Sequence, residues 1–261
     1  MNQLISRSLP AIVAALCLCS TAQAVVLDWD SVVWTPGYSN SFDVDAANAG
    51  NDVTVSVSGA TANLQYGTPA RTTNFQGGLA TAQNTLALGV DFTNQSQVIT
   101  VTVDFSALYL QGVQNVSFTI FDVDFDNVNG SGGSRYQDQL RSIIALDMNG
   151  IAIAPIITTS ANNSASTGLN QVVTGHTSTP DTGAGSNAGN VTISFGTASI
   201  RSFSFIYGSG SGTANDPTYQ HIGLHDINFT PVPEINPAWT ALASCFAAGV
   251  LVLRHRANFR R

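Results

Sequence analysis

Three aspartates alternate with apolar residues along one short stretch, and a fourth follows soon after. Asp122, Asp124 and Asp126 form the first group, and Asp138 comes after a Gly-, Ser- and Asn-rich stretch at residues 127–134. Carboxylate oxygens on a flexible loop are the ligands that Ca²⁺ prefers. The spacing differs from that of an EF-hand loop, which needs Gly at its sixth position and Glu at its twelfth. The four aspartates therefore predict a candidate Ca²⁺ site of another kind, at the end of a strand.

The hydrophobic pattern changes parity within the same stretch. Ile120 and the apolar residues before it share one face of an extended strand, whereas Phe121 and Val123 share the other. A straight strand would place the aspartates on the buried face, where unpaired carboxylates are costly. Three alternatives follow. A bulge turns the chain, or the strand end is solvated and its carboxylates pair with Arg135 or Arg141, or a cation lies among them.

Other reactive arrangements are weak in this sequence. His221 and His225 would lie on one face of a strand about 13 Å apart, which is too far for both to bind one metal ion. Ser, His and Asp all occur, but the Gly-x-Ser-x-Gly sequence of a nucleophile elbow does not. No pair of carboxylates can be selected as a glycosidase pair from spacing alone. The sequence therefore predicts a protein that is not an enzyme.

Aromatic side chains indicate a second class of function. A flat ring can stack on the apolar face of a sugar, and its polar edge can donate a hydrogen bond. This keeps open a carbohydrate-binding module or a carbohydrate-active enzyme as the alternative. Two of the three tryptophans lie early in the chain and could instead cover the core. The candidate residues are Trp29, Trp34, Tyr38, Tyr136 and Tyr219.

The elements that must position these residues are strands. Apolar and polar residues alternate with a period of two at residues 53–58 and 99–105, which is typical of half-buried strands. The pair Asn149-Gly150 tolerates positive φ and predicts a tight hairpin. Two low-complexity stretches, 158–190 and 208–218, are predicted loops, the first with a weak strand around Gln171. The remaining strand candidates are residues 25–29, 116–125, 142–148, 151–157, 191–195, 200–207 and 222–229.

About nine short strands joined by Gly-, Ser- and Asn-rich turns predict an all-β fold, an antiparallel β-sandwich of jelly-roll or immunoglobulin-like type. We expect one domain at residues 25–230. The chain has no lysine, and residues 25–231 hold four arginines against fifteen aspartates. Such a surface repels phosphate, so nucleic acid is excluded as a partner. This part of the chain also has no cysteine and therefore no disulfide framework.

The first twenty-four residues have the pattern of a secretory signal peptide. Arg7 supplies a positive start, residues 9–19 are apolar, and Ala22-Gln23-Ala24 is a small-x-small cleavage sequence. We expect signal peptidase to cleave after Ala24.

The last thirty-one residues, 231–261, have the pattern of a membrane anchor. Residues 237–253 carry no charge, and a helix of this length would be about 25 Å long, just enough to cross a bilayer. Positive charge follows at once, in the basic tail at residues 254–261, so the preceding chain is expected outside the cytoplasm. The basic residues are Arg254, Arg256, Arg260 and Arg261.

The order of these parts resembles the PEP-CTERM sorting signal of Gram-negative bacteria. The motif residues are Val232, Pro233 and Glu234, with Ile235 in place of the second motif proline and Pro237 two residues later. The resemblance covers about an eighth of the chain and implies an address, not a chemistry. It implies an exosortase-type partner, an inner-membrane anchor before processing, and a cell-surface or extracellular-matrix location afterwards. The expected function is a non-catalytic surface protein that interacts with exopolysaccharide or the cell envelope.

Overall fold

The computed structural model describes residues 23–126, 135–160, 162–176, 183–217 and 219–233. Ala22 and Glu234, residues 237–253 and the basic tail at 254–261 lie outside these ranges, so the predicted cleavage sequence is described only at residues 23–24 and the C-terminal signal only at residues 231–233. No helix within the described ranges is long and apolar enough to cross a membrane.

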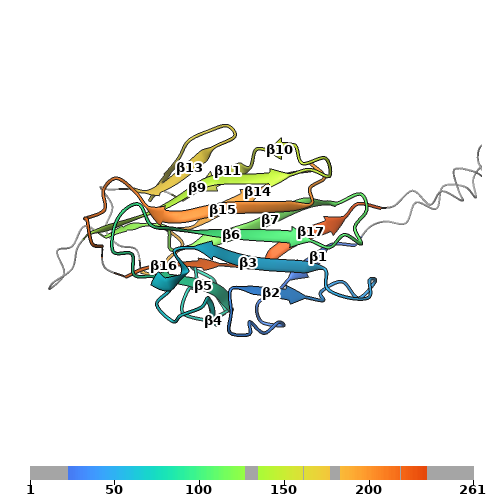
Figure 1. The fold of residues 1–261 in the computed structure, drawn as a ribbon, viewed down its shortest axis with the longest axis horizontal. Coiled ribbons are helices and arrows are strands. Elements are labelled where there is room, and N and C mark those ends of the chain that lie inside the picture. Colours follow the sequence, from blue (N-terminus) through green and yellow to red (C-terminus); the bar gives the residue numbers. More distant parts are fainter. Residues whose placement is uncertain (1–22, 127–134, 161, 177–182, 218, 234–261) are drawn as a thin grey trace, which may run out of the picture. The chain divides into compact units, whose positions relative to one another are not determined.

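Residues 23–232 form one compact unit of two antiparallel sheets, which confirms the predicted all-β sandwich (Figure 1). The choice between jelly-roll and immunoglobulin-like topology stays a prediction. In the first sheet the strand order is β1 (Val25–Leu27), β17 (Ile227–Pro231), β7 (Val113–Phe121), β16 (Gln220–Leu224), β5 (Thr85–Val90) and β4 (Ala70–Thr72), with β14 (Val191–Ser194) joining β7 to β11 (Ile156–Thr159).

The second sheet packs against the first. Its order is β12 (Asn163–Ala165), β13 (Gln171–Gly175), β9 (Tyr136–Leu146), β15 (Ser202–Ser209), β6 (Val98–Phe105), β3 (Val53–Gly59) and β2 (Ser39–Phe42), with β8 (Phe125–Asp126) and β10 (Ala152–Ile153) also paired to β9. A 3-10 turn, η1, spans Thr61–Asn63.

The core lies between the inward faces of the two sheets. From Ile99 to Phe105 of β6 the apolar residues are buried and the threonines between them are partly exposed, as the period-two pattern predicts. Phe118 of β7 stacks on Phe203 of β15, with ring centroids 4.6 Å apart. Since these rings come from opposite sheets, aromatic packing helps to hold the layers together.

Three of the predicted strands are wrong in their extent. The strand expected at 116–125 ends at Phe121, because Asp122 adopts a left-handed conformation with φ of 67°. The strand expected at 222–229 is divided into β16 and β17, and the strand expected at 151–157 is divided into β10 and β11, which belong to different sheets. Strand β5 was not predicted, because all six of its residues are buried and no alternation marks it.

The hairpin at Asn149-Gly150 is confirmed, but its turn differs from a two-residue turn. Strands β9 and β10 pair on either side of it, and Gly150 N–H donates to Asp147 O at 3.0 Å. Only Gly150 of the pair has positive φ, at 80°. A three-residue loop that ends in a left-handed glycine gives this geometry. The weak strand around Gln171 is also confirmed, as β13.

The two ends of this unit are defined by the strands β16 and β17. Strands β16 and β17 follow one another along β7, from Gln220 to Pro231. We call the end at Pro231 the exit end, because Val232 N–H donates there to Gly112 O at 3.0 Å and the chain leaves toward its C-terminus. The end at Gln220 is the far end. Eleven extended residues place the two ends roughly 36 Å apart.

Candidate functional site

A pocket of about 550 Å³ lies at the far end, on the outer face of the first sheet. We call it the far-end pocket. Strands β4, β5 and β16 form its floor, and the residue after β7 and the first residue of β9 contribute to its wall. Its lining residues are Tyr66, Ala70, Thr72, Asn74, Phe75, Ala87, Asp122, Tyr136, Gly183, Ala184 and His221.

Two glycines on the floor strands make room for the larger side chains of the pocket. A Cβ atom on Gly89 would lie 2.7 Å from Cδ2 of His221, and one on Gly223 would lie 2.7 Å from Cβ of Phe75. Neither distance is tolerated between non-bonded carbons. The absence of side chains at these positions therefore lets His221 and Phe75 lie close to the sheet.

A small apolar cluster supports one side of the pocket. Phe75, Ala87 and Phe121 are buried together, and Ala184 packs against them. Gln76 N–H donates to Ala184 O at 2.8 Å, which joins the two segments that cover this face. Phe121 thus points outward into this cluster, whereas Ile120 belongs to the main core. This accounts for the parity change that the sequence displays between these two residues.

The pocket combines aromatic rings with hydrogen-bonding groups. The side chain of Tyr66 is 64% exposed, and that of Tyr136 is half-buried. Burial lowers the pKa of His221, which favours the neutral imidazole, and its Nε2 contacts Oε1 of Gln65. Asn74 adds an exposed amide. Rings for stacking beside a few amide, imidazole and carboxyl groups suit a neutral polyhydroxylated ligand.

The four predicted aspartates do not share one environment. Asp122 lines the far-end pocket, whereas Asp124 and Asp138 are buried, with 1% and 0% of their surface exposed. Asp126 pairs with Tyr136 across β8 and β9. The solvated strand end is therefore wrong for the two buried acids, and the turn at Asp122 is the alternative that the structure bears out.

The two buried acids are directly connected. Asp138 N–H donates to Asp124 O at 2.9 Å, and Asp124 N–H donates to Oδ2 of Asp138 at 3.3 Å. Within the described ranges, no three His, Cys, Asp or Glu side chains gather at a spacing that could hold a metal ion. The Ca²⁺ site stays a prediction.

Asp138 is instead the centre of a buried polar cluster. Tyr207 donates its hydroxyl to Oδ1 of Asp138 at 2.6 Å, and Gln220 Nε2 donates to the same oxygen at 3.4 Å. Burial raises the pKa of Asp138 well above its usual range, and the neighbouring Asp124 raises it further. The cluster links β9, β15 and β16 behind the far-end pocket.

The aromatic candidates separate into core and surface residues. Trp29 and Trp34 are buried, and Trp29 packs edge-on against Phe42 with ring centroids 5.8 Å apart, so these tryptophans cover the core and cannot stack on a sugar. Tyr38 and Tyr219 are 43% and 51% exposed. Neither of these tyrosines lines a described pocket.

Tyr66 is not among the aromatic residues that the sequence predicts for sugar stacking. It lies between η1 and β4, near Gly67 and Pro69, in a stretch without alternation. A tyrosine beside turn residues is a signal for an exposed ring, but its pocket is formed by segments distant in sequence.

The two histidines differ in their surroundings. His221 lines the far-end pocket, whereas Nε2 of His225 lies 2.8 Å from Oε1 of Gln83 and 3.8 Å from Oδ2 of Asp226. Both are partly buried; His221 belongs to β16, an inner strand of the first sheet, and His225 follows the end of that strand. Their side chains serve separate contacts.

Acidification is expected to destabilise the fold through His221. Because its pKa is lowered in the folded state, the stabilising contribution is present above the unfolded-state pKa of about 6.5 and is lost as pH falls from that value through the lower folded-state pKa. One group changes stability by at most about 1.4 kcal/mol per pH unit, and by less here because the ring is partly exposed. Thermal unfolding of the protein and of His221→Gln between pH 7.5 and 5.0 measures this. Equal pH slopes for both proteins would contradict it.

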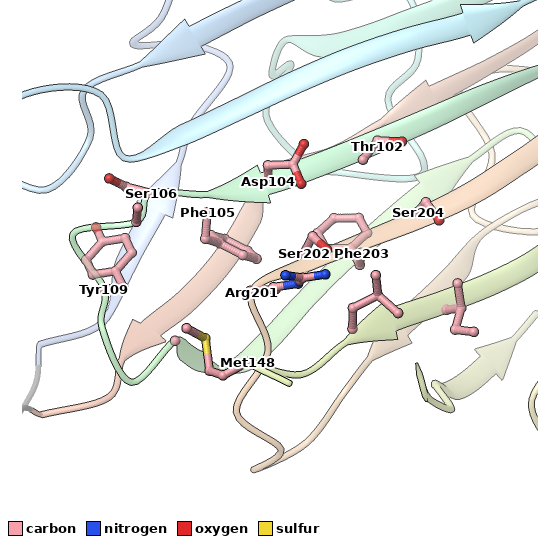
Figure 2. A pocket seen from close by; sticks show the side chains of 14 residues that line it. Thr102, Asp104, Phe105, Ser106, Tyr109, Met148, Arg201, Ser202, Phe203 and Ser204 are labelled. Carbon is pink, nitrogen blue, oxygen red and sulfur yellow. The ribbon is translucent and has the colours of Figure 1, made fainter. Parts of the chain in front are cut away.

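A second pocket, of about 500 Å³, lies on the outer face of the second sheet toward the exit end (Figure 2). Partial burial raises the pKa of Asp104, and the charge of Arg201 opposes this shift. Tyr109 borders the pocket but is buried, and its hydroxyl donates to Oδ1 of Asp52 at 3.0 Å. Its lining, which includes Ser106, therefore offers hydroxyls and charges without an exposed ring for stacking.

Comparisons with known proteins identify no family. No family model and no curated protein match this chain. One similar solved structure is a carbohydrate-binding module, CBM28, specific for non-crystalline cellulose, at 12% identity and a TM-score of 0.31, covering 62% of this chain and 79% of the other. Another is a carbohydrate-binding module, TmCBM27, studied for specific mannan recognition, at 13% identity and a TM-score of 0.31, covering 68% and 84%. Likenesses this distant assign no ligand to this chain.

Proposed function

We propose that this chain is an exported, non-catalytic β-sandwich that binds neutral polysaccharide through the far-end pocket. The observation that carries the proposal is the exposed ring of Tyr66 in a pocket that also contains Tyr136, His221 and Asn74. Sugar rings present an apolar face and a rim of hydroxyls, and this pocket offers both kinds of partner.

The charge of the protein supports a neutral ligand. The part of the chain between the signal peptide and the sorting motif carries fifteen aspartates and four arginines, and Asp122 lines the pocket itself. A negative surface repels uronic acids and sulfated sugars, and this repulsion is strongest at low ionic strength. Neutral glucans and mannans meet no such barrier.

Export and anchoring form the other part of the proposal. The supporting features are the signal peptide at 1–24, the apolar residues 237–253 and the arginines that follow them. Signal peptidase would release the N-terminus, and an exosortase-type enzyme would process the tail at the motif that begins with Val232. The protein would then act at the cell surface or in the extracellular matrix, where polysaccharide is abundant.

Affinity electrophoresis and calorimetry test the sugar-binding proposal. The probes are soluble β-glucan, galactomannan and xylan, with polygalacturonate as the anionic comparison. We expect saturable binding to at least one neutral polymer, no binding to polygalacturonate and no release of reducing ends. Binding to none of the three neutral polymers would contradict the proposal. Release of reducing ends would favour a carbohydrate-active enzyme.

A further inference from the structure

Four large apolar side chains are exposed on the loops of the exit end. Leu108 and Leu110 belong to the loop between β6 and β7, at 51% and 62% exposure, and Met148 and Ile151 belong to the β9–β10 hairpin loop, at 39% and 61%. We call these four residues the exit patch. Apolar side chains that cluster on exposed loops mark a surface that contacts another apolar phase.

The two loops are in contact with each other and with the departing chain. A Cβ atom on Gly112 would lie 2.9 Å from Sδ of Met148, so the hairpin loop packs on the end of the β6–β7 loop. Figure 2 shows Met148 close to the loop that carries Tyr109. Gly112 O also accepts the hydrogen bond from Val232 N–H. The two loops that carry the exit patch therefore meet at Gly112, which also contacts Val232, the last residue of the sandwich.

The carboxylate of the hairpin loop, Asp147, is bound within its own turn. Asp147 accepts hydrogen bonds from the backbone N–H groups of Asn149 and Ile151, at 2.8 and 2.7 Å. Asp52 is fully buried and accepts the Tyr109 hydroxyl. Asp52 belongs to the neighbouring β2–β3 loop, and Asp104 at the end of β6 is exposed, so the apolar tips of the two loops have one open carboxylate near them.

The sequence beyond the exit limits how far this end can lie from a membrane. Four Cα steps separate Pro233, the last described residue, from Pro237, where the apolar run begins. Each step covers at most about 3.6 Å, so the connection reaches about 14 Å at full extension. The polar headgroup layer alone is about 5–8 Å thick on each side of the hydrocarbon.

We infer that the exit patch lies in the headgroup region of the bilayer that anchors the chain, as a second contact beside the C-terminal segment. The inference rests on the proposed anchor and is independent of the sugar site. Transfer of Leu, Met and Ile side chains from water to the interface is favourable. Docking at this end holds the far-end pocket roughly 36 Å away from the membrane, facing the polysaccharide.

Nitroxide labelling of the full-length chain in nanodiscs tests the inference. The chain is produced without an exosortase, and the discs contain phosphatidylethanolamine and phosphatidylglycerol. Cys17 and Cys19 are replaced by alanine, and labels are placed one at a time at native Cys245 and at Leu110→Cys, Ile151→Cys and Tyr38→Cys in chains that also carry Cys245→Ala. Tyr38 is the matched control, because it is exposed and lies beside Val57 toward the far end.

The readout is the collision rate of each label with oxygen, which partitions into lipid, relative to a water-soluble nickel chelate. For Leu110→Cys and Ile151→Cys we expect a ratio at least about twofold above that of Tyr38→Cys, because the headgroup region admits oxygen more readily than the chelate. Ratios equal to that of Tyr38→Cys, with Cys245 in the hydrocarbon, would overturn the docking and leave the anchor intact. A Cys245 label exposed to the chelate would overturn the anchor, and the docking with it.

Discussion

Replacing Tyr66 by alanine is expected to weaken binding of neutral polysaccharide about tenfold, a loss of about 1.4 kcal/mol. Its ring is the most exposed aromatic surface in the far-end pocket, and loss of stacking and apolar contact with one sugar is of this size. Since 64% of the side chain faces solvent, the change leaves no core cavity, and the melting temperature should stay within about 2 °C. Calorimetry with the best polymer of the panel and a thermal melt measure both effects.

Tyr38→Ala provides the matched control for this experiment. Tyr38 is 43% exposed but does not line the pocket. We expect wild-type affinity from this variant. Equal loss of affinity in Tyr38→Ala and Tyr66→Ala would show that binding is spread over the surface, and unchanged affinity in Tyr66→Ala would exclude the far-end pocket as the binding site.

Replacing Asp138 by asparagine is expected to stabilise the protein at pH 7 and above, by at least about 1 kcal/mol or a rise of about 2–4 °C in melting temperature. The pKa of Asp138 is raised in the folded state, so its contribution is fully present below the unfolded-state pKa of about 3.9 and is lost as pH rises toward the folded-state pKa. Asparagine cannot ionise and keeps the Oδ1 acceptor for Tyr207, but its Nδ2 donor faces the Asp124 N–H that donates to Oδ2 in the native protein, and this lost hydrogen bond reduces the gain. Denaturation at pH 5, 7 and 8.5 should show a gain that grows with pH.

The same variant separates the buried-acid interpretation from the calcium prediction. If Ca²⁺ binds Asp138 together with Asp122, Asp124 and Asp126, calcium should raise the melting temperature of the native protein, and Asp138→Asn should abolish that rise. Without a calcium site, the stabilisation by Asp138→Asn should be the same with calcium or with a chelator. Tyr207→Phe is the control, since it removes the 2.6 Å hydrogen bond to Asp138 and retains the carboxyl group. A loss of stability in Asp138→Asn at every pH would contradict the first expectation.

The strands that could be predicted from the sequence are those with only one buried face. Strands such as β3 and β6 have one buried and one partly exposed face, so their alternation is visible in the sequence. Strand β5 was not predicted, because Phe75 and Phe121 cover its outward residue Ala87 and the strand therefore has no polar face. In the sequence, the end of the strand at Phe121 is visible only as a change in hydrophobic parity. The left-handed conformation of Asp122 goes with the packing of the Phe121 ring on the outer face of the sheet, which the sequence does not specify.

The candidate site was much less predictable. Tyr136 and Asp122 were selected for separate reasons, one as a stacking ring and one as a calcium ligand, yet they line the same pocket as Tyr66 and His221. Trp29 was the more obvious stacking candidate by residue type, but it is fully buried. Composition marks which residues can stack on a sugar, and it does not mark which of them face water.

The all-β class, the acidic composition, the absence of disulfides between residues 25 and 231 and the apolar run at 237–253 follow from the amino-acid sequence alone. These properties depend on composition, on the period-two alternation of strands and on uninterrupted apolar runs, all of which can be read from residues close together in the chain. The tertiary structure alone decided that residues 66, 122, 136 and 221 meet in one pocket and that Asp138 is buried behind it. Sheet order and the packing of covering loops bring these positions together, and both arise from contacts between segments far apart in the chain.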